Sequence, residues 1–323
     1  MPHSLTDEMR RRVLTLDGAM ATMLRQASPG EADLRGPRFA SRPGCYELLC
    51  LTRPDLVSDI HRAYIEAGAD IVKTNSFSAN AISLRPYGLE QHVGEINRRA
   101  AQIARRAVGP DRWVAGSMGP SDAALSAATC DVDFETLVRA FREQALALID
   151  GGVDLLLLET MFDLLNVRAA IAAIHDVRRT VGRDIPVIVS ATLTQSGLLP
   201  SGHTLEEFIA TVDDLTPLAI GLNCGFGPGS MLPALRRLRD CPYPVSVHPS
   251  AGLPDRAGRY PETPQPMASV VKTMLDERLV NIVGGCCGTT PEHIRLISQL
   301  SAAATPRPFR PVSYTHLRAH ETR

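Results

Sequence analysis

The chain has 323 residues, of which 44% are hydrophobic, and its formal net charge at pH 7 is −1. This length is enough for one large α/β domain or two smaller ones, and the near-neutral charge without a basic stripe argues against a nucleic-acid partner. No apolar run reaches the ~18 residues of a membrane span, so we expect no membrane contact. The N-terminal stretch MPHSLTDEMRRRVLTLDG has no signal-peptide core, and we therefore expect a cytoplasmic protein.

Short apolar runs alternate with longer amphipathic stretches along the chain. The runs cover residues 13–17, 70–75, 113–117, 154–160, 186–191, 219–224, 244–248 and 280–286. They are rich in Val, Ile and Leu without polar alternation, which is typical of parallel strands covered on both faces. Strands that alternate with helices over roughly 290 residues predict a (β/α)₈ TIM barrel, an α/β fold. An open doubly wound sheet is the alternative, but no G-x-G-x-x-G fingerprint follows the first strand.

Three of the stretches between strands carry clear helix signals. The first covers 53–69, with Thr52 and Pro54 as start signals and Gly68 as the end, and the others cover 134–152 and 291–303. The Pro- and Gly-rich segment 26–50 is expected to be an extended loop that covers one end of the barrel. We assign residues 1–303 to the barrel domain and 304–323 to a linker and a tail foreign to the fold, expected to be disordered.

Polar or sulfur-bearing side chains follow most of the predicted strands. In a (β/α)₈ barrel the active site lies at the carboxyl ends of the strands. The residues at these ends are Asp17, Thr74, Asn75, Ser117, Glu159, Asn223, Cys224, His248, Cys286 and Cys287. The sequence therefore predicts a functional rim at one end of the barrel.

The seven cysteines are an odd number without the spacing of a disulfide framework. Cys224 ends the sixth strand, and the adjacent pair Cys286 and Cys287 ends the eighth, so only one strand separates them. Three thiolates suit Zn²⁺, and a three-cysteine site leaves the fourth tetrahedral position open, as in catalytic zinc sites. Flanking glycines at 284, 285 and 288 allow the tight backbone path that directs two consecutive side chains to one ion.

A structural interpretation of the same residues stays open. Buried free cysteines are common, and Cys130, Cys241 and Cys224 taken singly favour packing. His248 and His293 are possible nitrogen ligands, although single histidines near helix starts are usually structural. Two carboxylates at one barrel mouth, Asp17 and Glu159, suit a bound ammonium group better than a core role.

A zinc ion with three thiolates can hold a substrate thiol as thiolate near neutral pH, which suits alkyl transfer to sulfur.

Seven stretches carry a resemblance to a known family. They are LDGAMATML, LTRPDLVSDIHRAYIEAGADIVKTNSFSANAISL, VAGSMGPS, GGVDLLLLETMFDLLNVRAAI, GLNCGFGP, HPSAGLP and NIVGGCCGTTPEHI, in order over nearly all of residues 10–300. In these stretches the chain resembles the homocysteine S-methyltransferase family, and most closely the N-terminal homocysteine-binding modules of cobalamin-dependent methionine synthases. The resemblance implies a (β/α)₈ fold and methyl transfer to homocysteine, which gives methionine.

The resemblance also implies roles for individual residues. Cys224, Cys286 and Cys287 would bind Zn²⁺ and carry the catalysis, with the homocysteine sulfur in the open position. The amino-acid pocket would include Asp17 with the backbone around Gly18 and Ala19, the ammonium contact Glu159, and Thr74, Asn75 and Ser117. The implied methyl donor is methylcobalamin on a missing or separate domain, so cobalamin- and folate-binding domains or proteins are expected partners beside homocysteine.

Three residues depart from the family pattern. Ala21 stands where Gly is common, Lys73 where an acidic residue is frequent, and Ser250 where Asn is usual. The change at 73 reverses a charge near the pocket, and the change at 250 leaves the resting fourth zinc ligand open. Two other functions also stay open: a self-contained methyltransferase that uses S-methylmethionine or betaine, and a homocysteine- or zinc-binding subunit without turnover.

Overall fold

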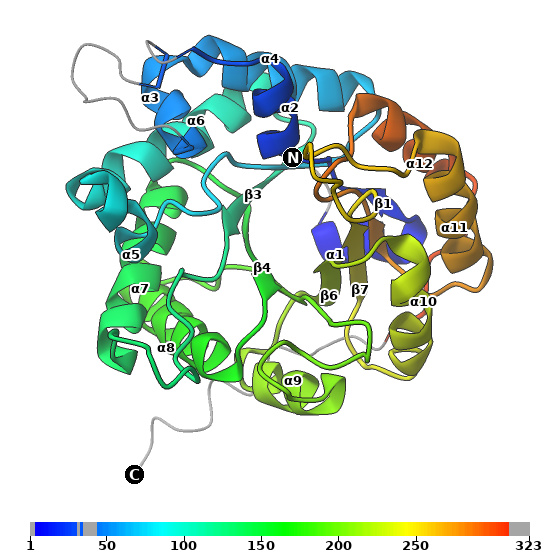
Figure 1. Cartoon of the computed structure of the whole chain (residues 1–323). Coiled ribbons are helices and arrows are strands. Elements are labelled where there is room, and N and C mark those ends of the chain that lie inside the picture. Colours follow the sequence, from blue (N-terminus) through cyan, green and yellow to red (C-terminus); the bar gives the residue numbers. More distant parts are fainter. Residues whose placement is uncertain (1–3, 31–32, 35–43, 310–323) are drawn as a thin grey trace.

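The computed structural model describes residues 4–30, 33–34 and 44–309, and these form a (β/α)₈ barrel (Figure 1). The strands are β1 (Leu14–Thr15), β2 (Ile71–Lys73), β3 (Trp113–Met118), β4 (Leu155–Met161), β5 (Val187–Ala191), β6 (Ala219–Cys224), β7 (Val245–Pro249) and β8 (Ile282–Val283). Each of the eight predicted runs overlaps one of them, and β3, β4 and β7 extend one residue beyond their runs, which confirms the fold prediction.

The strands form one parallel sheet that closes on itself. Its order is β1-β8-β7-β6-β5-β4-β3-β2, and a parallel bridge between Leu16 and Ile71 joins the two outer strands. The backbone N–H of Asp17 donates to the carbonyl of Ile71 at 3.0 Å across this seam. An open doubly wound sheet would have two free edges here, so the closure rules out that alternative.

Alternate residues along the strands point into the barrel and out toward the helices. On β4, Leu155 and Leu157 belong to the inner apolar cluster, whereas Leu156 and Leu158 pack in the larger cluster between strands and helices. This period of two follows from the pleat of a strand. Continued along β4, the inner series reaches Glu159, so the interior changes from apolar to polar at the carboxyl ends.

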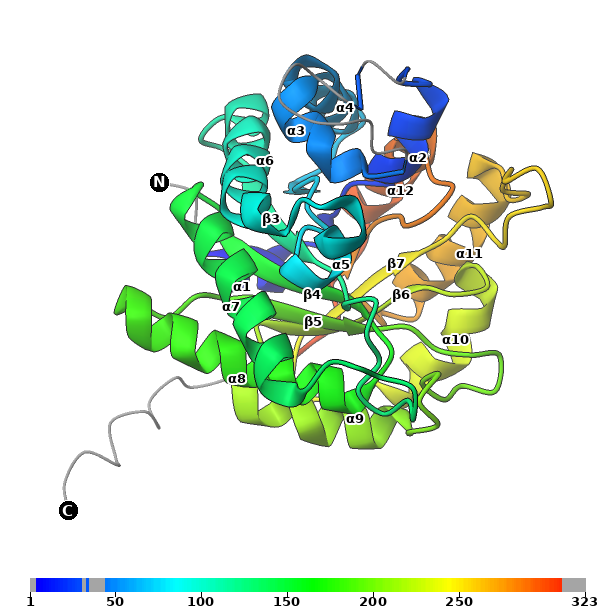
Figure 2. The same cartoon turned by 60° about the vertical axis from the view of Figure 1, so that its left-hand side comes forward.

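The helices surround the strands in an outer ring (Figure 1), except α1, which lies within this ring in that view, and Figure 2 shows α7, α8 and α9 beside β4 and β5. They are α1 (Leu5–Arg11), α2 (Met20–Gln26), α3 (Leu49–Thr52), α4 (Pro54–Glu66), α5 (Ala81–Leu84), α6 (Val93–Val108), α7 (Phe134–Asp150), α8 (Leu164–Val181), α9 (Leu205–Val212), α10 (Pro228–Arg237), α11 (Pro264–Asp276) and α12 (Pro291–Ala302). The three predicted helices correspond to α4, α7 and α12. Thr52 ends α3 and does not cap α4, whose N-cap is Arg53.

The segment expected to be one extended loop, residues 26–50, contains regular structure where it is described. A 3₁₀ turn at Tyr46–Leu48 leads directly into α3. Residues 31–32 and 35–43 lie outside the described residues. Residues 44–47 line the cavity at the barrel mouth, so this part of the segment covers the expected end of the barrel.

The chain continues past α12 along the barrel surface. Arg307 is buried and donates hydrogen bonds to the carbonyls of Leu238 and Tyr243, both at 2.9 Å. The described residues 304–309 thus pack on the preceding domain, and the rest of the expected tail, 310–323, lies outside the described residues. Within the described part of the chain, the helices are too short or too polar to cross a membrane.

Candidate active site

A cavity of about 460 Å³ opens at the carboxyl ends of the strands. Most of the residues predicted for the site line it: Gly18, Ala19, Thr74, Asn75, Ser117, Glu159, Cys224, Cys286 and Cys287. Asp17 does not line the cavity, and Lys73 does. The volume is typical of small-molecule sites, which are ~300–1,000 Å³.

Three sulfurs meet on one wall of this cavity. The Sγ atoms of Cys224 and Cys287 are 4.0 Å apart, and those of all three cysteines lie within 4.8 Å of one another. A tetrahedral ion at about 2.3 Å from each sulfur would separate them by roughly 3.8 Å, so the group could hold a metal ion with little movement. Cys224 has φ +63°, a left-handed conformation that is uncommon for residues other than glycine and that turns the chain at the end of β6.

The glycines around the cysteine pair are required by close contacts. A Cβ at Gly284 would lie 2.5 Å from the carbonyl of Leu16, and one at Gly285 would lie 2.4 Å from Thr289 Oγ1. Gly288 has φ +80°, and a Cβ there would lie 2.2 Å from the ring of Tyr260. The backbone can therefore bring two consecutive thiols to the cavity only without side chains at these positions.

The three thiols do not lose their protons independently. Hydrogen bonds from Cys224 and Cys286, together with one from Tyr260, lower the pKa of Cys287. The pKa of Cys286 is raised well above its ordinary value, because its hydrogen bonds to the other two thiols, its burial and their charges disfavour its thiolate. One negative charge is thus favoured and further charges are resisted. A divalent cation would supply the attraction that three thiolates need.

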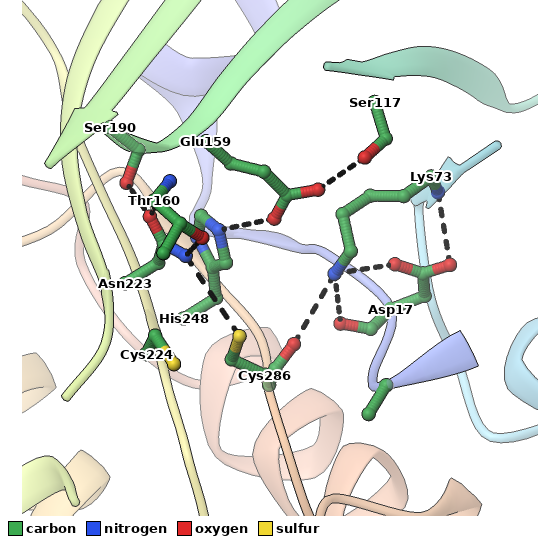
Figure 3. A network of polar contacts seen from close by, with 12 residues as sticks. Asp17, Lys73, Ser117, Glu159, Thr160, Ser190, Asn223, Cys224, His248 and Cys286 are labelled. Carbon is green, nitrogen blue, oxygen red and sulfur yellow. Dashed lines mark hydrogen bonds and ion pairs between the residues drawn. The ribbon is translucent and has the colours of Figure 1, made fainter. Parts of the chain in front are cut away.

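Glu159 is a buried carboxylate that lines the same cavity, and Figure 3 shows its contacts with Ser117 and His248. Its Oε1 accepts a hydrogen bond of 2.5 Å from Ser117 Oγ, and its Oε2 lies 3.2 Å from His248 Nε2. Burial alone would raise the pKa of Glu159, but the hydrogen bond from His248, the charge of Lys73 and the hydrogen bond from Ser117 lower it. Burial lowers the pKa of His248, so a neutral imidazole that donates through Nε2 fits this contact.

Asn223 joins three strands behind the cysteines. Its Oδ1 accepts hydrogen bonds from the backbone N–H of Thr160 at 2.8 Å and from Ser190 Oγ at 2.7 Å. Its Nδ2 donates to Thr160 Oγ1 at 2.7 Å and lies 3.9 Å from the sulfur of Cys286. Thr160 has φ +61°, so these bonds hold a strained residue directly after Glu159.

Asp17 and Lys73 form a buried ion pair next to Glu159 (Figure 3). Lys73 Nζ lies 3.0 Å from Asp17 Oδ1, and the Lys73 backbone N–H donates to Asp17 Oδ2 at 3.0 Å. Burial raises the pKa of Asp17 to about 6, although Lys73 opposes this shift. Burial alone would lower the pKa of Lys73, but the charges of Asp17 and Glu159 outweigh it and raise the pKa.

Thr74 and Asn75 use their polar atoms within the protein. Thr74 Oγ1 accepts from the backbone N–H of Ser117 at 2.9 Å and contacts Ser76 Oγ at 2.6 Å. The amide of Asn75 donates to the carbonyl of Tyr46 at 2.9 Å. These two residues therefore fix the shape of the cavity wall between β2 and β3.

Two further candidates are not part of the three-sulfur group and bond to backbone groups. His293 accepts a hydrogen bond from the backbone N–H of Thr290 at 3.2 Å and so caps α12. Ser250 donates to the carbonyl of Gly225 at 2.7 Å. The sequence interpretation also missed Tyr260, Tyr46, Glu47 and Tyr87, which line the cavity from a loop and from two 3₁₀ turns. Residues outside strands and long helices follow no periodic pattern that would have predicted their position at the cavity. Ser190 lies on β5, so the alternation of inward and outward side chains along this strand could have predicted that it supports the site.

This geometry combines three thiols that could hold a metal ion with a buried carboxylate in one cavity. Such a site could hold a small molecule that carries a thiol at one end and an ammonium group at the other. The thiol would reach the three cysteines, and the ammonium would reach Glu159.

Comparisons with known proteins agree with this architecture. The family model described as homocysteine S-methyltransferase matches residues 14–301. The metallated form of the homocysteine methyltransferase MmuM from Escherichia coli is 24% identical, with a TM-score of 0.69, over 89% of this chain and 96% of that chain. Its oxidized form is also 24% identical, with a TM-score of 0.70, over 89% and 95% of the two chains. Its apo form is 23% identical, with a TM-score of 0.65, over 92% and 98%. At this identity the solved structures establish a shared fold.

Proposed function

This chain belongs to the homocysteine S-methyltransferase family, and we propose that it methylates the sulfur of homocysteine to give methionine with Zn²⁺ bound by Cys224, Cys286 and Cys287. The observation that carries the proposal is the position of the three sulfurs and Glu159 on one cavity. The ligand set supports zinc, which favours thiolates in tetrahedral sites and keeps an open position when only three protein ligands are present. When bound, the ion would keep the substrate thiol deprotonated near neutral pH.

The chain's own residues orient the amino acid. We propose that the ammonium group of homocysteine binds Glu159, whose carboxylate is held by Ser117 and His248. Each carboxylate oxygen can accept a further hydrogen bond, so these contacts leave capacity for the substrate. Gly18, Ala19, Thr74 and Asn75 form the surrounding wall. The sulfur then attacks the methyl carbon of the donor: a new S–C bond forms, the bond from carbon to the donor breaks, and the donor keeps the electron pair.

For the donor, we propose methylcobalamin presented at the barrel mouth by a cobalamin domain, with a folate-binding domain to supply the methyl group. The support is the sequence resemblance to modules of cobalamin-dependent methionine synthases.

A self-contained enzyme that uses S-methylmethionine or betaine is the second candidate, and one observation favours it. The cavity of about 460 Å³ is large for homocysteine alone and leaves space for a second small molecule.

One experiment distinguishes these functions. Zinc-loaded protein is incubated with homocysteine and with methylcobalamin, S-methylmethionine or betaine in turn, and methionine is measured. Formation from methylcobalamin supports the module, and formation from either small donor supports the self-contained enzyme. Homocysteine binding without methionine from any donor would contradict methyl transfer and leave a binding subunit. Calorimetry in buffers of different ionisation enthalpy should detect about one proton released on homocysteine binding.

A further inference from the structure

The ammonium group of Lys73 has three oxygen neighbours within 3.4 Å. It lies 3.0 Å from Asp17 Oδ1, 3.4 Å from the carbonyl oxygen of Asp17 and 3.3 Å from that of Gly285. The contacts with the two carbonyls are hydrogen bonds, and the third contact is the ion pair with Asp17. These contacts hold the ammonium group of Lys73 against Asp17 (Figure 3).

Both carboxylate oxygens of Asp17 face Lys73, although Oδ1 takes part in the ion pair without a hydrogen bond from the described residues. Its Oδ1 faces the ammonium group and its Oδ2 accepts from the backbone N–H of the same lysine. Asp17 is 1% exposed and does not line the cavity, whereas Lys73 and Glu159 do. The sequence predicts two substrate-facing carboxylates, but the lysine separates one of them from the cavity.

Among the residues that the structure describes, the charges of these buried groups leave the carboxylate of Glu159 without a cationic partner of its own. At neutral pH the negative charge of Asp17 and the positive charge of Lys73 cancel at short range. Glu159 is held by the hydroxyl of Ser117 and by His248, whose imidazole is neutral because burial lowers its pKa. The trio Asp17, Lys73 and Glu159 therefore carries a net charge of about −1.

We propose that Glu159 alone binds the ammonium group of the amino-acid substrate, and that Asp17 is a positioning residue that acts by neutralising Lys73. This inference rests on the proposed function, because it concerns the recognition of homocysteine in the same cavity. It makes the Asp17–Lys73 pair a determinant of specificity. If Asp17 lost its charge, the cation of Lys73 would stand uncompensated beside Glu159 and repel the substrate ammonium.

Three thiols and four proteins test the proposal. The thiols are homocysteine, 3-mercaptopropylamine, which lacks the carboxylate, and 4-mercaptobutyrate, which lacks the ammonium. Their dissociation constants are measured by calorimetry on zinc-loaded wild type, Asp17→Asn, the double variant Asp17→Asn/Lys73→Met, and Lys272→Met. Lys272 is the only other lysine of the chain. It is exposed on α11 and ion-paired with Asp276, so it controls for loss of a lysine charge.

In Asp17→Asn, the affinity for 3-mercaptopropylamine should fall at least about tenfold relative to that for 4-mercaptobutyrate. The double variant removes both charges with side chains of similar size, so it should fold even if a single variant does not. It should restore the wild-type ratio to within about threefold, because the net charge returns to that of the wild type. Lys272→Met should keep the wild-type ratio.

Two results would overturn the proposal. Equal loss of 3-mercaptopropylamine affinity in Asp17→Asn and in the double variant would mean that Asp17 contacts the ammonium directly. An unchanged ratio in Asp17→Asn would mean that the pair has no influence on recognition. Either result can occur while wild type still binds homocysteine, so the proposed function would stand. A wild-type protein that binds none of the three thiols would instead contradict the proposed function.

Discussion

The sulfurs of Cys224 and Cys287 lie 4.0 Å apart although 63 positions separate the two residues in the chain. Cys224 ends β6, and Cys287 follows β8, with β7 between these strands in the sheet. A parallel barrel places the ends of such strands on one rim, so both side chains reach the same cavity. This relationship is the basis of the first prediction.

Zinc content should depend on each of the three cysteines. Wild type should hold about one zinc ion per chain, and Cys286→Ala or Cys287→Ala should lower the retained zinc severalfold, since two thiolates bind more weakly than three. Metal analysis after dialysis measures this. Cys241→Ala is the matched control, because Cys241 is half-buried and lies outside the three-sulfur group. Full zinc in either of the first two variants would contradict shared ligation.

Glu159→Gln should weaken homocysteine binding much more than zinc binding. A charge-assisted contact between ammonium and carboxylate is worth roughly 1.5–3 kcal/mol, or about a tenfold to hundredfold change in affinity. Calorimetry on the zinc-loaded variant measures the loss, with Glu66→Gln at the exposed end of α4 as control. Loss of zinc with unchanged homocysteine affinity would mean that the Glu159 carboxylate stabilises the metal site and does not contact the substrate.

Gly288→Ala should disturb the cysteine pair through Tyr260. The new Cβ would lie 2.2 Å from the tyrosine ring, and φ is +80°. The overlap and the strained backbone should together lower the free energy of unfolding by roughly 1–3 kcal/mol and reduce zinc retention. Gly182→Ala has φ +65° with no neighbour within 4 Å, so it tests backbone strain alone and should retain zinc. Equal zinc retention in both variants would show that the Tyr260 contact does not support the site.

The free energy of unfolding should fall with acid because of His61. This residue is fully buried on α4, and neither ring nitrogen has a hydrogen-bond partner among the described residues. Burial lowers its pKa from 6.5 to about 4. Between these values the unfolded chain binds a proton that the folded chain does not bind, so stability present above pH 6.5 is lost as the pH falls toward 4.

From pH 7 to pH 5 this histidine should cost about 2 kcal/mol of unfolding free energy. His61→Leu replaces it with an apolar side chain of similar size that does not titrate. Urea unfolding of both proteins at pH 7 and pH 5 should show a pH-dependent loss that is smaller in the variant by about that amount. An equal loss in the two proteins would assign the acid sensitivity to other groups.

Local patterns in the sequence were sufficient to predict the fold and the group of three cysteines that could hold a metal ion. Apolar runs without alternation mark strands covered on both faces, and each of the eight runs overlaps a strand. Polar residues after such runs must lie at one rim, because parallel strands share a direction. This argument led to Cys224, Cys286 and Cys287 before any coordinates, and the structure places the three sulfurs within 4.8 Å of one another.

Contacts between side chains of different strands could not be predicted from local patterns in the sequence. The pairing of Asp17 with Lys73 depends on how β1 and β2 meet at the closing seam, and that register is a property of the whole barrel. A lysine next to a predicted substrate carboxylate could have pointed into the cavity or toward its neighbour. Only the packed structure places it over Asp17 with three oxygens around its ammonium group, because burial of that charge requires acceptors that distant segments supply.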